Sequence, residues 1–238
     1  MPPGGIGNDG KINQSTIFGG GGYLVDTSND GSDFISLSTP KGISRSLLHG
    51  NGGHDTIRIG GIVSTTFDNR NDMYETSIYG GHGDDSIMVQ HPVSNGFSIT
   101  SSLITGNRGN DTLHLSGAIV TTSIYGGHGD NYIDFGYGFD KSGNETNTYY
   151  FGSETGADTL NFSQVHTSGG LRLTVAVDSS LGVRPASFIY DTSEQTISLG
   201  SSGKSIFING YTGTKVDSVN TLGLTFTTVS SSVITSLG

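Results

Sequence analysis

Short segments of the chain alternate between apolar and polar residues with a period of two. After each of six stretches rich in glycine and aspartate, two apolar residues stand two positions apart, as Ile87 and Val89 do. Because successive side chains of a β-strand point to opposite faces, this spacing places both members of a pair on one face. The pattern predicts short strands with one buried face. The pairs are Ile35 and Leu37, Ile57 and Ile59, Ile87 and Val89, Leu113 and Leu115, Ile133 and Phe135, and Leu160 and Phe162.

A second set of apolar residues precedes these stretches by two positions. Its members are Leu48, Ile78, Ile104, Ile124 and Tyr150. Each repeating unit therefore predicts a strand, a glycine-rich turn and a second strand. Stacked units of this kind bury one continuous apolar core that no single unit could bury. We therefore expect an all-β fold in which residues 1–163 form a parallel β-solenoid.

The turns share a pattern of glycine and aspartate. Three stretches carry it nearly complete, namely GNGGHDTIR (50–58), GGHGDDSIM (80–88) and GNRGNDTLH (106–114). Weaker copies are GGIGNDGKI (4–12), SNDGSDFIS (28–36), GGHGDNYID (126–134) and SETGADTLN (153–161). Successive copies are 20 to 30 residues apart, so each coil has room for one such turn. We expect one row of glycine–aspartate turns and, on the other side, an irregular row of connections, short at 117–123 and long at 60–75.

This pattern resembles the nonapeptide G-G-x-G-x-D-x-U-x, with U a large apolar residue, of the calcium-binding repeats-in-toxin (RTX) family. The resemblance implies several calcium ions, each held between the turns of neighbouring coils. Carboxylates and glycine carbonyls supply the hard oxygen ligands that calcium prefers. Four copies depart from the template. Lys11 stands at an apolar position, Asn131 replaces an aspartate, and the copies at 28–36 and 153–161 lack the leading glycines. By the resemblance, the metal ligands would be Asp9, Asp33, Asp55, Asp85, Asp111, Asp130 and Asp158.

Composition narrows the set of partners. The net charge is −10, which disfavours nucleic acid and membrane surfaces that are themselves anionic. The chain contains no cysteine, which excludes disulfides and cysteine-ligated zinc. No segment has the length and apolar character of a membrane-spanning helix, and the first residues do not form a secretory signal peptide. Because the repeat reaches these first residues, we expect the sequence to be a piece of a longer chain.

Two other kinds of site are weighed against calcium. His54, His82 and His128 recur at or near one position of the turns, which would suit a transition metal. The adjacent Asp84 and Asp85 are of the type that performs acid–base chemistry on a sugar. No nucleophile–base pair, phosphate loop or G-x-S-x-G turn stands out. We therefore expect no catalytic residues and no enzymatic activity.

After Phe162 the repeat ends, and residues 164–238 are expected to form a small β-rich cap. A solenoid needs a cap because its last coil exposes an unpaired strand edge. The resemblance to RTX proteins also implies a type I secretion signal in this region. The segments with the composition of short strands are 171–177, 187–191, 196–200, 205–210, 224–230 and 233–237.

The predicted function is that of a calcium-binding structural solenoid in a secreted or cell-surface bacterial protein, of the surface-layer or adhesin type. Such a chain would fold when it meets calcium outside the cell. Its expected partners are calcium ions, with self-assembly or a cell-surface polysaccharide as further candidates, and neither nucleic acid binding nor membrane insertion is expected. The alternative is an accessory module of a type I-secreted enzyme, such as a protease, lipase or alginate epimerase, whose catalytic domain lies outside this sequence.

Overall fold

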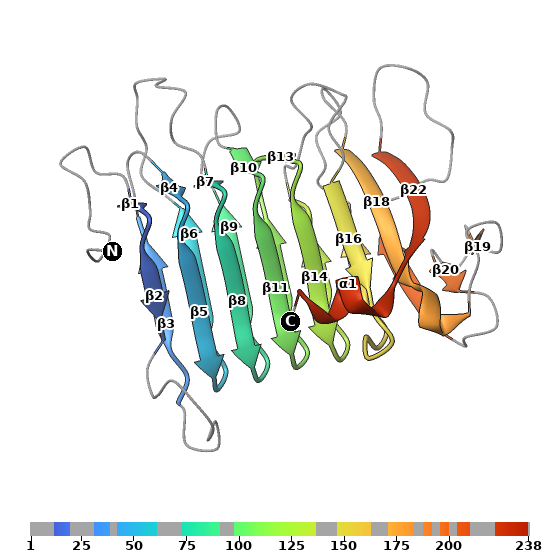
Figure 1. Cartoon of the computed structure of the whole chain (residues 1–238), viewed down its shortest axis with the longest axis horizontal. Helices are drawn as coiled ribbons and strands as arrows, with labels where there is room; N and C mark the ends of the chain where they lie inside the picture. The colour runs from blue at the N-terminus through green and yellow to red at the C-terminus, as the bar shows by residue number, and fades with distance from the viewer. Residues whose placement is uncertain are drawn as a thin grey trace.

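The structure, a computed structural model, is an elongated stack of coils with three sheets of parallel strands along its length (Figure 1). Each of the first five coils contributes one strand to each sheet. The predicted parallel β-solenoid is therefore confirmed. Within the described part of the chain, no helix is long and apolar enough to cross a membrane. The described residues are 12–19, 31–38, 42–60, 73–90, 98–136, 147–162, 171–182, 188–191, 196–199, 204–209 and 222–237.

Strands that precede the glycine-rich turns form an eight-stranded sheet. Across the sheet they are β2 (Thr16–Phe18), β5 (Leu47–Gly52), β8 (Ser77–His82), β11 (Leu103–Arg108), β14 (Ser123–His128), β16 (Asn147–Phe151), β18 (Leu171–Asp178) and β22 (Leu222–Val229). The predicted apolar residues from Leu48 to Ile124 are fully buried on its inner side. In β16 the buried residue paired with Ile124 is Tyr149. The prediction of Tyr150 is therefore wrong by one residue, a slip that moves a side chain to the other face.

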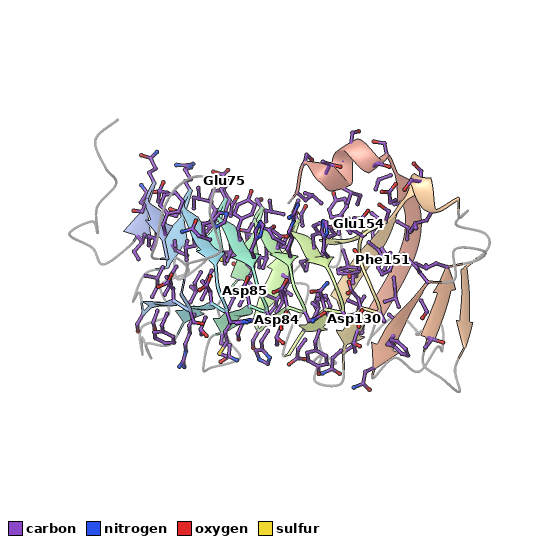
Figure 2. All side chains as sticks on the ribbon, turned by 90° about the horizontal axis from the view of Figure 1, so that it is seen from below. Glu75, Asp84, Asp85, Asp130, Phe151 and Glu154 are labelled. Atoms are coloured by element: carbon purple, nitrogen blue, oxygen red, sulfur yellow. The ribbon has the colours of Figure 1, made fainter. Side chains whose placement is uncertain are left out.

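Strands that follow the turns form a nine-stranded sheet opposite the first one. Across the sheet they are β3 (Phe34–Leu37), β6 (Thr56–Gly60), β9 (Ser86–Gln90), β12 (Thr112–Leu115), β15 (Tyr132–Asp134), β17 (Thr159–Asn161), β21 (Ser205–Asn209), β20 (Thr196–Leu199) and β19 (Phe188–Asp191). The pairs predicted from the period of two lie in register, so that Ile57, Ile87 and Leu113 stack as one fully buried column. Figure 2 views the two facing sheets from the end at which the turns lie.

A third face, which the sequence suggested would be irregular, contains a five-stranded parallel sheet. Its strands are β1 (Ile12–Asn13), β4 (Ile43–Ser44), β7 (Met73–Tyr74), β10 (Ser98–Thr100) and β13 (Ala118–Val120). Each strand sends one buried apolar side chain into the core, such as Ile43, Met73 and Ile99. A strand with a single inward residue has no detectable alternation, and this is why the sequence pattern did not reveal the sheet. The long connections within 60–75 lie largely outside the described residues.

The corner between the five- and eight-stranded sheets repeats in every coil. A residue other than glycine adopts a left-handed conformation there, with φ between 47° and 50° at Gln14, Arg45, Glu75, Ser101 and Thr121. A Ser or Thr follows it. Ser46 Oγ accepts the backbone N–H of Ser15 in the preceding coil, and Ser102 Oγ accepts that of Thr76 in the same way, both at 3.2 Å. In the last such step the Asn147 side chain accepts the Thr122 N–H at 3.0 Å. This hydroxyl ladder satisfies buried backbone donors where the chain turns between sheets.

The sheets continue past residue 163, where the glycine–aspartate turns end. β18 pairs in parallel with β16, and β22 pairs in parallel with β18. Leu173, Val175 and Val177 extend the buried core into this region. On the opposite sheet, β21 is parallel to β17, whereas β20 and β19 add in antiparallel orientation. The C-terminal residues thus prolong the stack before closing it with antiparallel strands.

One C-terminal prediction is wrong. The segment 233–237 was expected to be a strand, but Ser231–Thr235 form a short helix, α1, on the outer face of the eight-stranded sheet (Figure 1). Ser231 Oγ donates a 2.7 Å hydrogen bond to the Asp178 carboxylate, and Ile234 is buried against the sheet. Over five residues, tertiary contacts of this kind outweigh the strand preference of Val233, Ile234 and Thr235.

Candidate metal site

The glycine-rich turns stack the residues at the template aspartate position into one line, which we call the inner row. Each backbone N–H in the row donates to the side-chain oxygen Oδ1 of the residue in the next coil. The hydrogen bonds are Asp33 to Asp55 (2.7 Å), Asp55 to Asp85 (2.8 Å), Asp85 to Asp111 (2.7 Å), Asp111 to Asn131 (2.9 Å) and Asn131 to Asp158 (2.8 Å). The fold therefore brings five of the predicted ligands together, with Asn131 as a member of the same row.

The second carboxylate oxygens of the row are the unusual feature of the site. Asp85 and Asp111 are 3% and 1% exposed, and among the described residues their Oδ2 atoms have no hydrogen-bond partner. A buried acceptor without a partner typically costs about 1 to 3 kcal/mol, and more when it is charged. A proton or a cation bound to these oxygens would therefore stabilise the folded chain.

Each of these oxygens faces a glycine, and the missing side chain of that glycine leaves a space beside the oxygen. A Cβ on Gly80 would lie 2.7 Å from the Gly106 carbonyl oxygen and closer still to Asp85 Oδ2. Gly106 repeats the arrangement one coil later with Asp111 Oδ2 and the Gly126 carbonyl oxygen. Oxygens from two neighbouring coils thus border the same space, and any larger residue would fill it. The glycines are needed for this close approach rather than only for the turn.

Asn131 shows what a neutral donor does at the same position. Its Nδ2 atom lies beside Gly126 as the carboxylate Oδ2 atoms lie beside Gly80 and Gly106. The Asn131 amide donates to the Gly129 carbonyl at 3.3 Å and to Asp158 Oδ1 at 3.0 Å. In the last coil the Tyr149 hydroxyl donates to Asp158 Oδ2. This end of the row is therefore saturated by protein donors.

Burial shifts the ionisation of the row toward the neutral acid. Burial is the main cause and neighbouring aspartates add to it, and together they raise the pKa of Asp85 to about 7 and that of Asp111 to about 8. Burial also raises the pKa of Asp158, to about 6, although hydrogen bonds from Tyr149 and Asn131 oppose the shift. In the calcium-free chain, the row therefore binds protons at a pH at which ordinary aspartates are ionised.

This shift predicts that the calcium-free chain loses stability as pH rises. The three folded-state pKa values, about 6 to 8, exceed the ordinary value of 3.8, so the folded chain binds more protons than the unfolded chain between pH 4 and pH 8. The contribution to stability is complete below about pH 4 and disappears as pH passes the folded-state pKa values. Urea unfolding at pH 4.5 and pH 8 after exhaustive dialysis would measure the difference. Equal stability at both values would contradict it.

Asp130 is not in the inner row. It belongs to a second row, the outer row, which runs parallel to the inner one. Its members stand one position before each inner-row residue, and they are His54, Asp84, Asn110 and Asp130. These side chains are exposed and accept backbone N–H groups from the next coil, as Asp130 Oδ1 does from Ala157 at 2.7 Å. The two rows therefore bond in opposite directions along the stack. Asp9, the remaining predicted ligand, lies outside the described residues.

The structure separates the members of the two alternative sites, the carboxylate pair and the histidine site. Asp85 Oδ1 accepts from Asp55 in the preceding coil, whereas Asp84 Oδ1 accepts from Asn110 in the following coil. The two carboxylates thus bond to opposite neighbours, one buried and one exposed (Figure 2). His54 lies in the outer row, while His82 and His128 end strands β8 and β14. In the described part of the chain, no three His, Cys, Asp or Glu side chains form a cluster that could hold a metal ion by themselves.

Sequence comparison adds no relative to this picture, because no protein-family model and no curated protein matches the chain.

Proposed function

We propose that the protein is a calcium-binding structural solenoid, whose inner row takes calcium ions between coils and whose folding is completed by them. The observation that carries the proposal is the pair of buried carboxylate oxygens on Asp85 and Asp111, which have no hydrogen-bond partner among the residues that the structure describes. Their surroundings fit calcium, because glycine carbonyls of the neighbouring coil border the same space. Calcium accepts six to eight oxygen ligands in flexible geometry, whereas magnesium requires a tight octahedral site and retains water.

Calcium would be held along the aspartate part of the row rather than along all of it. The four consecutive aspartates are Asp33, Asp55, Asp85 and Asp111, whereas Asn131 and Tyr149 supply neutral donors to the following positions. Ions bound between the aspartates would neutralise stacked charges and would link each coil to the next. In this account the amide of Asn131 and the hydroxyl of Tyr149 close the metal-binding stretch at its C-terminal side.

The proposed setting is the cell surface or the medium outside a bacterial cell. Extracellular calcium modules bind with dissociation constants of about 0.1 to 1 mM, weak enough to stay empty inside a cell and to fill outside it. A chain of this kind would remain incompletely folded until export. The resemblance of its turns to RTX repeats supports the same setting. The role is structural and not enzymatic.

Calorimetric titration tests the proposal directly. At pH 7.5 we expect calcium to bind with a dissociation constant of about 0.1 to 1 mM, and magnesium to bind far more weakly. Asp85→Ala removes a buried ligand and should reduce both the affinity and the number of ions bound. Asp130→Ala, in the exposed outer row, is the matched control and should bind as the unchanged chain does. Equal binding by the two variants, or equal responses to calcium and magnesium, would refute the proposal.

A further inference from the structure

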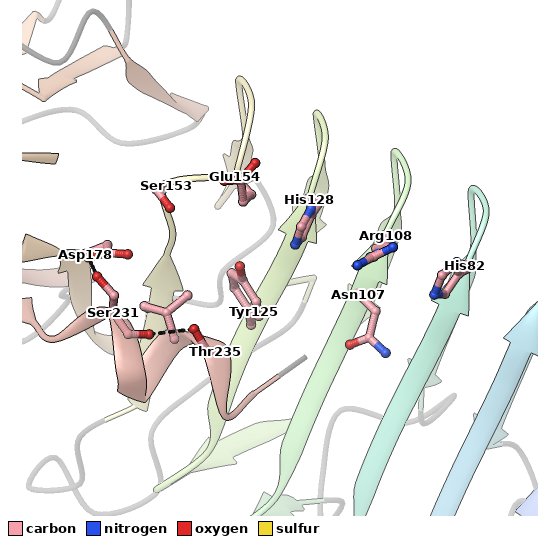
Figure 3. Close-up of a pocket in the computed structure, with 11 residues that line it drawn as sticks. His82, Asn107, Arg108, Tyr125, His128, Ser153, Glu154, Asp178, Ser231 and Thr235 are labelled. Atoms are coloured by element: carbon pink, nitrogen blue, oxygen red, sulfur yellow. Dashed lines mark hydrogen bonds between the residues drawn. The ribbon is translucent and has the colours of Figure 1, made fainter. Parts of the chain in front are cut away.

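A pocket of about 360 Å³ lies away from the inner row, between helix α1 and the outer face of the eight-stranded sheet (Figure 3). Tyr125 and Ile234, which are 4% and 6% exposed, are the buried apolar members of its lining and give it an aromatic and an aliphatic surface. The helix is held in place by the hydrogen bond between Ser231 and Asp178, so that the Asp178 carboxylate is engaged within the protein.

One side of the pocket carries a line of basic side chains. His82, Arg108 and His128 occupy paired positions on three neighbouring strands, at the usual strand spacing of about 4.8 Å. Figure 3 shows the three side chains in a row near the turns. Of the described residues that line the pocket, Arg108 is the only Lys or Arg. It is exposed, and within the described part of the chain its guanidinium makes neither a hydrogen bond nor an ion pair.

The rest of the lining offers neutral and acidic hydrogen-bonding groups. Ser153 and Glu154 are exposed at the rim on the far side, and Asn107 precedes Arg108 on the side of the basic residues. A carboxylate such as that of Glu154 can only accept hydrogen bonds, so a ligand group that bonds to it must be a donor, as a hydroxyl group is. The pocket therefore combines a guanidinium fork, an acceptor for hydroxyl groups and a surface suited to C–H groups.

We propose that this pocket binds a sugar acid, that is, a polyhydroxylated monocarboxylate. A guanidinium binds a carboxylate through two parallel hydrogen bonds. A single permanent positive charge, in a pocket that also contains the carboxylate of Glu154 and in a chain of net charge −10, matches a monoanion better than the dianion of phosphate. The hydroxyl groups of the sugar would bond to Glu154, Asn107 and the histidines, and its C–H face would pack on Tyr125 and Ile234. The inference does not depend on the calcium proposal, because none of the lining residues belongs to the inner row.

Ligand-observed NMR with D-glucuronate at constant calcium concentration tests this inference. We expect saturable binding of glucuronate, and binding about tenfold or more weaker for glucose, which lacks the carboxylate, and for acetate, which lacks the hydroxyl groups. Arg108→Gln should weaken glucuronate binding about tenfold or more, since it removes a charged hydrogen bond. Arg58→Gln, at an exposed position of the nine-stranded sheet, is the control and should leave binding unchanged.

Four outcomes would overturn the inference. They are no binding of glucuronate, binding that Arg108→Gln leaves unchanged, equal binding of glucose, and phosphate that binds as tightly as glucuronate. The last of these would identify a simple anion site. Because the Arg108 side chain is exposed and its guanidinium makes neither a hydrogen bond nor an ion pair among the described residues, its substitution should leave the melting temperature unchanged. A loss of binding in a variant with that melting temperature therefore reports on the pocket itself.

Discussion

At neutral pH, removal of calcium is expected to lower the stability of the stack by several kcal/mol, so that a large fraction of the molecules unfolds, and millimolar calcium is expected to restore them. Without the ion, the carboxylates of Asp85 and Asp111 must be buried either with a negative charge or with a proton, and both states oppose folding at this pH. Each site saturated to 100 times its dissociation constant adds about 2.7 kcal/mol of stability. Two or three such sites would contribute as much as the whole stability of many domains, about 5 to 15 kcal/mol.

Far-ultraviolet circular dichroism and thermal unfolding would measure this effect. We expect the β signal to fall in excess chelator, to return with calcium and not to return with an equal concentration of magnesium. The melting temperature should rise steadily with calcium concentration, because the ion binds the folded chain. A spectrum and melting temperature that are the same in chelator and in calcium would contradict the expectation.

The second large effect concerns Asp111→Asn, which we expect to stabilise the chain without calcium and to destabilise it with calcium. In calcium-free buffer at pH 7.5, we expect this variant to be more stable than the unchanged chain by about 1 to 3 kcal/mol. The unchanged carboxyl must be buried there either with a charge or with a proton that an ordinary aspartate would not bind, and the amide avoids both costs. Asn131 already makes such hydrogen bonds one coil further on. In calcium the order should be reversed, because the variant has lost a charged ligand.

Urea unfolding with and without calcium would test the reversal. Asp130→Asn makes the same chemical change in the exposed outer row and should alter stability by less than about 0.5 kcal/mol in either buffer. If Asp111→Asn were destabilising in both buffers, the carboxylate would have a partner that does not depend on calcium. If it were neutral in both, the buried oxygen would not carry the cost assigned to it.

Much of the architecture was predictable from side-chain periodicity. Ile87 and Val89, with their counterparts in other coils, define the inner face of the nine-stranded sheet because a strand of four or five residues shows its alternation. The five-stranded sheet was missed because strands such as Met73–Tyr74 contain one inward residue each. The one-residue error at Tyr150 arose where two tyrosines stand side by side, and sequence alone did not show which of them faces the core.

Part of the candidate metal site was also predictable, because the turns repeat one pattern. A fixed spacing within each turn identified Asp33, Asp55, Asp85, Asp111 and Asp158 as one row. It could not separate the inner row from the outer one where both positions carry oxygen, and Asp130 was therefore assigned beside Asn131. Tyr149 was missed as a member of the site because its hydroxyl meets Asp158 through the core, nine residues away along the chain. A polar aromatic residue at a core position, beside a turn that has lost its leading glycines, was the signal available.

The most direct test of the account is a crystal structure of the chain grown in millimolar calcium, with the ions located by their anomalous scattering. We expect calcium at the Oδ2 atoms of Asp85 and Asp111, with carbonyl and carboxylate oxygens of two coils at about 2.3 to 2.6 Å from the metal. We expect no ion between Asn131 and Asp158, where the amide and the Tyr149 hydroxyl already serve the carboxylate. Well-ordered turns in which Asp85 and Asp111 contact protein or water alone, without a cation, would contradict the account.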